Sequence, residues 1–323
     1  MGINRDKPDR WKPDIAASVD LYNAWFMLFA PITFRETRIR TAQAVEQALK
    51  TTQNLADLSP ELLMANPGVL PMLRMATCPP IARDRLIGLA GVSKNLVESM
   101  EDEKRLRVPP RMALLDIRAE LIKIAGVVSR LADVDICVWL GRATAPTRIE
   151  IRRAASIIAD RLCGATADPI VRNEQERRQL KLIGTWLQAR GYSPAAPGVR
   201  YNTMVPGTYS FRLNVPVQKL ADSGVVYQVN IPIDAAILPI SAEPGSLPLM
   251  IEAKSAGDFT NTNKRRKEEA QKMQQLRVSH GADLRFILFL CGYFGTDYLG
   301  YEAAEGIDWV WEHRIDDLVE FNL

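Results

Sequence analysis

The sequence predicts a protein of mixed α and β structure, α+β or α/β, in which a helical N-terminal region precedes a region of helices and strands. Two observations support this fold class. Apolar residues recur at helical spacing up to about residue 165, and beyond residue 208 they form alternating or β-branched runs. The composition, 47% hydrophobic and 24% charged, is typical of a globular chain. We therefore expect two domains, 1–165 and 166–323.

Three amphipathic segments predict the N-terminal helices: "PDIAASVDLYNAWFMLF", "PRMALLDIRAELIKIAGVVSRL" and "TRIEIRRAASIIADRL". Short helices broken by prolines are expected over 59–100. The apolar run "NAWFMLFAPITF" is shorter than the roughly 20 residues that span a bilayer. We expect a core helix there and no membrane segment.

Strand signals dominate after one further helix, expected over about 173–190. "YSFRLNVPVQ", "VVYQVNIPIDAAILPI" and "LPLMIEAK" predict strands, with turns at "ADSG" and "SAEPGS", so an antiparallel three-stranded meander is expected. A helix over about 264–279 and the strand "LRFILFLCGYF" complete the order α-β-β-β-α-β. The tail adds a predicted strand, "IDWVWEH", and a predicted short helix, "RIDDLVEF".

Cysteine, histidine and charge usage limit the chemistry. The four cysteines form no CxxC pair, which indicates neither a zinc ribbon nor a disulfide framework and favours a reducing cytoplasm. With only two histidines, a metal site would have to rest on carboxylates, which favour hard ions such as Mg²⁺. The net charge is −2 over 166–323 and +5 over 1–165, so the N-terminal half could hold a polyanion such as nucleic acid.

Two acids and a lysine stand in or at the end of apolar runs that are predicted to be strands. Glu252 and Lys254 share one face of their predicted strand, because side chains alternate across a strand. Asp234 is the only charge in the preceding apolar run, and a hairpin would bring it beside Glu252. A shared divalent ion and the lysine would offset the cost of burying both carboxylates. Acid-x-Lys triplets also arise by chance, and Asp102-Glu103-Lys104 is an example in a charged run without a strand.

Two flanking segments could contribute to the same site. Glu176 falls on the apolar stripe of the helix over 173–190, as a third carboxylate or as an acid favoured by the helix dipole. "SAGDFTNTNKRRK" carries four cations, at 264–267, into the start of a helix, where they oppose the dipole and would suit a docked anion. A solvated basic run or a nuclear-localisation-like patch is the alternative interpretation.

Together these residues resemble the PD-(D/E)XK nuclease core, a mixed central sheet flanked by helices. Asp234 precedes Glu252-Ala253-Lys254 by eighteen residues within the order α-β-β-β-α-β. "EAKSAGDFTNTNKRRKEEAQK" and "RNEQERRQL" resemble the XamI-like type II restriction endonucleases over the chain from about residue 173. One departure is Ile233 before Asp234, with the proline at 232.

The resemblance implies a Mg²⁺-dependent hydrolase that cuts double-stranded DNA at specific sequences and leaves 5′-phosphate ends. Asp234 and Glu252 would hold one or two Mg²⁺ ions, with the backbone carbonyl of Ala253. Lys254 would orient or help deprotonate the attacking water, and Glu176 would assist the metal site. The residues implied in DNA contacts are Ser255, Asp258, Asn261, Lys264, Arg265 and Lys267.

The rest of the expected biology follows from that resemblance. Target recognition and dimerisation would fall to 1–165, a palindromic target would imply a homodimer, and a DNA methyltransferase is expected as genetic partner. A phosphate-binding GxxxxGK[ST] loop, a GxSxG elbow and a zinc finger are missing from the sequence. The alternatives are a repair or recombination nuclease of the same fold and a non-catalytic DNA-binding protein.

Overall fold

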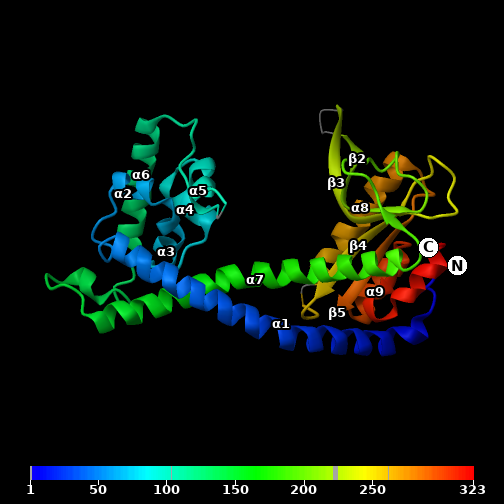
Figure 1. Cartoon of the computed structure of the whole chain (residues 1–323), viewed down its shortest axis with the longest axis horizontal. Helices are drawn as coiled ribbons and strands as arrows, with labels where there is room; N and C mark the ends of the chain where they lie inside the picture. The colour runs from blue at the N-terminus through cyan, green and yellow to red at the C-terminus, as the bar shows by residue number, and fades with distance from the viewer. Residues whose placement is uncertain (1, 103, 221–224, 261) are drawn as a thin grey trace. The chain divides into compact units, whose positions relative to one another are not determined.

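The computed structural model describes residues 2–102, 104–220, 225–260 and 262–323, with the side chains of 220 and 263–266 excepted. It divides the chain into two compact units, which share two long helices (Figure 1). Unit 1 comprises Met1–Phe29 and Arg172–Leu323, and unit 2 comprises Ala30–Val171. The sequence placed the boundary at 165/166 and did not assign the first 29 residues to the C-terminal unit.

The N-terminus joins unit 1 through specific contacts. The backbone N–H of Asn4 donates to Asp308 at 2.9 Å, and its side-chain amide donates to the carbonyl of Trp309 at 2.8 Å. Further along, the Ser18 hydroxyl accepts the N–H of Gly292 at 2.8 Å. A Cβ at Gly292, whose φ is +101°, would lie 2.1 Å from the carbonyl oxygen of Ala256, so only glycine fits this approach.

The two shared helices are longer than the sequence predicted. Helix α1 runs over Pro8–Thr51 and helix α7 over Arg148–Gln188, where a break near 164–173 and a separate helix were expected. Helix α7 continues through Pro169, although an interior proline costs about 3 kcal/mol. Burial on both sides of the proline, by Ala159 and Cys163 in unit 2 and by Ile183 in unit 1, offsets that cost.

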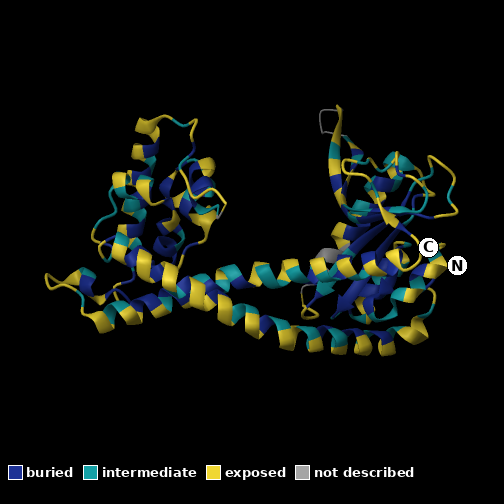
Figure 2. Ribbon diagram, viewed as in Figure 1, coloured by how far each residue is buried: buried dark blue, intermediate teal, exposed yellow. Residues whose placement is uncertain are grey.

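The expectation of a core helix at 23–34 is wrong for most of that run. Met27, Leu28 and Ile32 on α1 are 72%, 73% and 59% exposed. Figure 2 shows many exposed positions along the middle of this helix. Among the described residues α1 is the one helix long and apolar enough to cross a membrane. This is weak evidence, because core helices of soluble proteins and signal sequences meet the same criterion.

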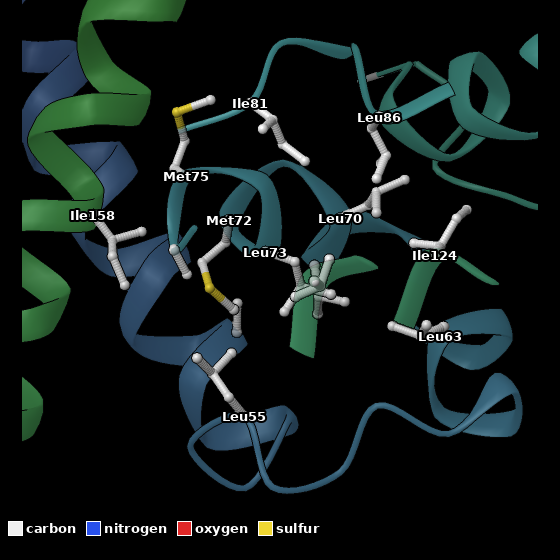
Figure 3. Packing of buried hydrophobic residues seen from close by; sticks show 14 of the residues in the cluster. Leu55, Leu63, Leu70, Met72, Leu73, Met75, Ile81, Leu86, Ile124 and Ile158 are labelled. Atoms are coloured by element: carbon white, nitrogen blue, oxygen red, sulfur yellow. The ribbon is translucent and has the colours of Figure 1, made fainter. Parts of the chain in front are cut away.

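Unit 2 is a helical domain with its own core. Short helices follow one another through the predicted Pro-broken stretch, and Leu70, Met72 and Leu73 pack at its centre (Figure 3). Arg74 and Glu101 form a buried ion pair with contacts of 2.6 and 2.8 Å. The elements are α2 Pro60–Ala65, η1 Pro67–Val69, α3 Leu70–Met75, α4 Arg83–Ala90, α5 Lys94–Glu101, α6 Leu114–Leu131 and η2 Val138–Gly141.

Unit 1 contains a six-stranded mixed sheet in the order β1-β2-β3-β4-β5-β6. The strand pairs β2–β3 and β3–β4 are antiparallel, and the pairs β1–β2, β4–β5 and β5–β6 are parallel. The predicted meander and the order α-β-β-β-α-β are therefore confirmed, while the "ADSG" turn lies outside the described residues. The strands are β1 Ser193–Pro194, β2 Thr208–Leu220, β3 Val226–Leu238, β4 Leu249–Ala256, β5 Phe286–Gly292 and β6 Asp308–Trp311.

Helices cover both faces of this sheet. Leu180, Ile183 and Leu187 of α7 pack on one face. Met273 and Leu276 of α8 and Leu299 of α9 belong to the cluster on the other face. The remaining elements are α8 Thr262–His280, α9 Thr296–Ala304 and η3 Glu312–Phe321, the last matching the predicted short helix.

Candidate active site

The pairing of β3 with β4 sets Asp234 opposite Glu252. Ala235, Ala236 and Ile237 pair with Ile251, Met250 and Leu249, so the next position in the same register places the two acids across from each other. Asp234 Oδ2 accepts the backbone N–H of Ala253 at 2.9 Å. Burial, and then the negative charge of Glu252, raise the pKa of Asp234 to about 6.

The sheet is distorted at this point. Ile231 and Ile233 of β3 belong to the core cluster on the α8 side, whereas Ala235 and Ile237 belong to the cluster on the α7 side. The side-chain alternation therefore shifts across Asp234. Arg212 of β2 faces Asp234 and has a φ of +54°. Residues other than glycine rarely adopt this backbone conformation, which recurs at functional sites.

Lysines neutralise the buried carboxylates. Lys254 Nζ lies 3.1 Å from Glu252 Oε1 and 3.1 Å from Glu269 Oε1. The Lys272 ammonium contacts the other oxygen of Glu252. Burial alone would lower the pKa of Lys254, but the charges of Glu252 and Glu269 outweigh burial and raise it. Lys254 is therefore a cation at neutral pH, suited to donating hydrogen bonds.

Two glutamines of α7 reach the site from the face of the sheet that lies opposite α8. Gln179 Nε2 donates to the carbonyls of Phe289 and Lys254 at 3.3 and 3.4 Å, and its Oε1 accepts the hydroxyl of Ser255 at 3.0 Å. Gln175 is 6% exposed, and its Nε2 has no hydrogen-bond partner among the described residues. Both line one cleft of about 440 Å³ together with Asp234, Glu252 and Lys254.

Comparison with known proteins decides the family. The family model of the XamI restriction endonuclease matches residues 53–311. The chain is 54% identical over 320 residues to the type II restriction enzyme SalI of Streptomyces albus G, an alignment that covers 98% of each protein. This chain belongs to the XamI restriction endonuclease family. The expected fold class and the expectation of a type II restriction endonuclease are confirmed. No solved structure matches the chain significantly.

The structure brings together most of the residues that the sequence selected for the candidate site. Asp234, Glu252, Ala253 and Lys254 line the cleft, and so do Ser255 and Asp258. Glu176 also lines it, but its Oε1 accepts hydrogen bonds from Arg212 Nε and Nη2 at 3.1 and 3.0 Å. The roles of these residues stay predictions.

Other predicted contacts fall elsewhere. Lys267 is exposed on α8 and does not line the cleft. Asn261 lies outside the described residues, and so do the side chains of Lys264 and Arg265. The second triplet lies in unit 2, where Asp102 and Lys104 belong to no strand and Asp102 pairs with Arg105 at 3.2 Å.

Sequence reasoning missed Glu269, Lys272, Gln175 and Gln179. A signal for Glu269 existed in the helical spacing of α8. Met273 follows Glu269 by four residues and Leu276 follows Met273 by three, so all three lie on the buried stripe of the helix. Uncharged glutamines on α7 carried no comparable signal.

The donor set fits a hard divalent ion. Asp234 and Glu252 offer carboxylate oxygens in one cleft, and magnesium sites typically use one or two carboxylates with water and substrate phosphate. Clusters of three or more His, Cys, Asp or Glu side chains that could hold an ion do not occur in the described part of the chain. A site here would thus rely on these two carboxylates and on non-acidic ligands.

Glu302 of α9 yields a prediction on pH. It is fully buried, and burial together with the charge of Glu269 raises its pKa to about 8. The pKa of this carboxyl is near 4.5 in the unfolded chain and about 8 in the fold. The carboxyl therefore destabilises the fold increasingly as the pH rises through this range. Each pH unit within this range lowers the free energy of unfolding by about 1.4 kcal/mol. We expect Glu302→Gln to flatten the decline in the free energy of unfolding over this range, measured by urea denaturation at several pH values.

The control is Glu243→Gln, an exposed acid in the loop between β3 and β4. It should retain the pH dependence of the unsubstituted protein. A Glu302→Gln profile as steep as that of the control would contradict the assignment.

Proposed function

We propose that the chain hydrolyses phosphodiester bonds of double-stranded DNA at a specific sequence, using Mg²⁺ held by Asp234 and Glu252. The observation that carries the proposal is the meeting of these two carboxylates with Lys254 in one cleft. The relative of known activity is named a type II restriction enzyme, which supports the same reaction here. Family membership favours this function over repair, recombination or non-catalytic DNA binding.

The side chains have distinct tasks in this reaction. A bound Mg²⁺ supplies the positive charge that polarises the phosphodiester and promotes ionisation of water. Lys254, held between Glu252 and Glu269, orients the attacking water or the scissile phosphate by donating hydrogen bonds. Gln179 fixes the backbone of Lys254 and the hydroxyl of Ser255, which keeps the end of β4 in place. The expected products are 5′-phosphate and 3′-hydroxyl ends.

Unit 2 offers a surface for DNA. Arg148, Arg152 and Arg153 of α7 are exposed and line a groove of about 560 Å³. Within the described residues these three arginines form no ion pair with an acid. Unpaired arginines on a helix face suit phosphates, which contribute most of the salt-dependent affinity for DNA. We assign this surface to contacts with the DNA backbone.

Three further features belong to the proposal by analogy with restriction systems. The protein acts as a homodimer on a palindromic site, a DNA methyltransferase protects the same site, and both work in the cytoplasm, where their DNA lies. Contacts to base edges come from unit 2 and from the segment 255–267.

Substitution at the cleft tests the reaction. We expect Asp234→Asn and Lys254→Met to slow Mg²⁺-dependent cleavage of plasmid DNA by about 100-fold or more, because each removes several kcal/mol of transition-state stabilisation. The readout is the rate at which a defined fragment ladder forms. Asp316→Asn, far along the chain in η3 and outside the cleft, is the control. Normal cleavage by either cleft variant would refute the site.

The arginine surface makes a separate prediction. Replacing Arg148, Arg152 and Arg153 by alanine should weaken binding to all DNA sequences alike and reduce the slope of log affinity against log salt by up to about 3. Arg118→Ala is the matched control and should leave the slope unchanged, because Arg118 is exposed but already pairs with Glu61 at 3.2 Å. Fluorescence anisotropy at several salt concentrations measures both. An unchanged slope in the triple variant would exclude this surface.

A further inference from the structure

Glu252 is unusual in that each of its oxygens contacts a different lysine. Lys254 from the same strand lies 3.1 Å from Oε1, and Lys272 from α8 contacts Oε2. The side chain of Lys272 is 15% exposed, so its charge is largely removed from water. Lys254 is the lysine expected in such a site, whereas nothing in the proposed reaction yet explains Lys272.

Two clefts meet at Glu252 and have different linings. Asp234 lines the first cleft but not the second, and Lys272 lines the second cleft but not the first. The second cleft measures about 310 Å³ and also reaches Glu252 and Lys254. An ion between Asp234 and Glu252 would lie in the first cleft, while Lys272 contacts Glu252 Oε2 from the second.

Charge balance limits the number of ions that this cluster can hold. Asp234, Glu252 and Glu269 bring three negative charges, and Lys254 and Lys272 bring two positive ones. Glu302 lines neither cleft and is not counted. One divalent ion and one scissile phosphate make the cluster neutral. A second divalent ion would leave two uncompensated charges in a largely buried site, which is costly.

We propose that Lys272 serves as the second cation of the active site, in place of a second divalent ion, so that each site binds one metal ion. The inference rests on the proposed function and specifies its metal requirement. Lys272 is a positioning residue: it holds Glu252 through Oε2, while Lys254 contacts Oε1.

Counting bound Mn²⁺ tests this directly. We expect the full-length protein to bind one Mn²⁺ per protomer, measured by the electron paramagnetic resonance signal of free Mn²⁺. Lys272→Glu places a carboxylate beside Glu252 in the second cleft and should raise the count to two. Lys181→Glu, on the exposed face of α7, should leave the count at one. Two ions in the unsubstituted protein, or one in Lys272→Glu, would overturn the proposal.

A second variant covers the case in which Lys272→Glu does not fold. Lys272→Met removes only the charge and should tighten Mn²⁺ binding by about tenfold or more, because it removes a neighbouring cation. Lys272→Arg should restore the original affinity. Equal affinity in the Met variant and the unsubstituted protein would overturn the proposal. If the unsubstituted protein cleaves plasmid DNA into a defined ladder yet binds two ions, Lys272 loses this role and the nuclease assignment stands.

Discussion

The proposed active site depends on the antiparallel pairing of β3 with β4. That register is fixed by Ala235, Ala236 and Ile237, which are buried opposite Ile251, Met250 and Leu249. A slip of one residue would turn these apolar side chains to the wrong faces, so core packing enforces the register. The same register then sets two carboxylates against each other at the end of the ladder. Hydrophobic burial thus provides the free energy that holds like charges together.

Those like charges determine what surrounds them. Buried carboxylates require cations or hydrogen-bond donors, and the structure supplies Lys254 from β4, Lys272 from α8 and the N–H of Ala253. The lysines come from different elements, so the packing of α8 against the sheet is part of the site. The left-handed backbone of Arg212 occurs beside Asp234, where the sheet departs from regular alternation. The sheet is therefore distorted at the place where the chemistry is expected.

The local sequence pattern was enough to select the candidate site residues that lie on strands. Alternation placed Glu252 and Lys254 on one face, and the isolation of Asp234 in an apolar run marked it for the same site. The partners on helices were harder to predict, because which face of α8 meets the sheet is decided by tertiary packing. The continuity of α7 through Pro169 was missed for a related reason: burial in two separate units outweighs the local cost of proline. The docking of the N-terminus through Asn4 and Ser18 depends on residues about 300 positions away and leaves no local pattern.

The most direct test of the central claim is a crystal structure of the protein soaked in Mn²⁺, with the ion located by its anomalous scattering. The account predicts an ion about 2.1 Å from a carboxylate oxygen of both Asp234 and Glu252. An ion bound elsewhere, with the carboxyl groups of these two residues too far apart to share it, would contradict the account.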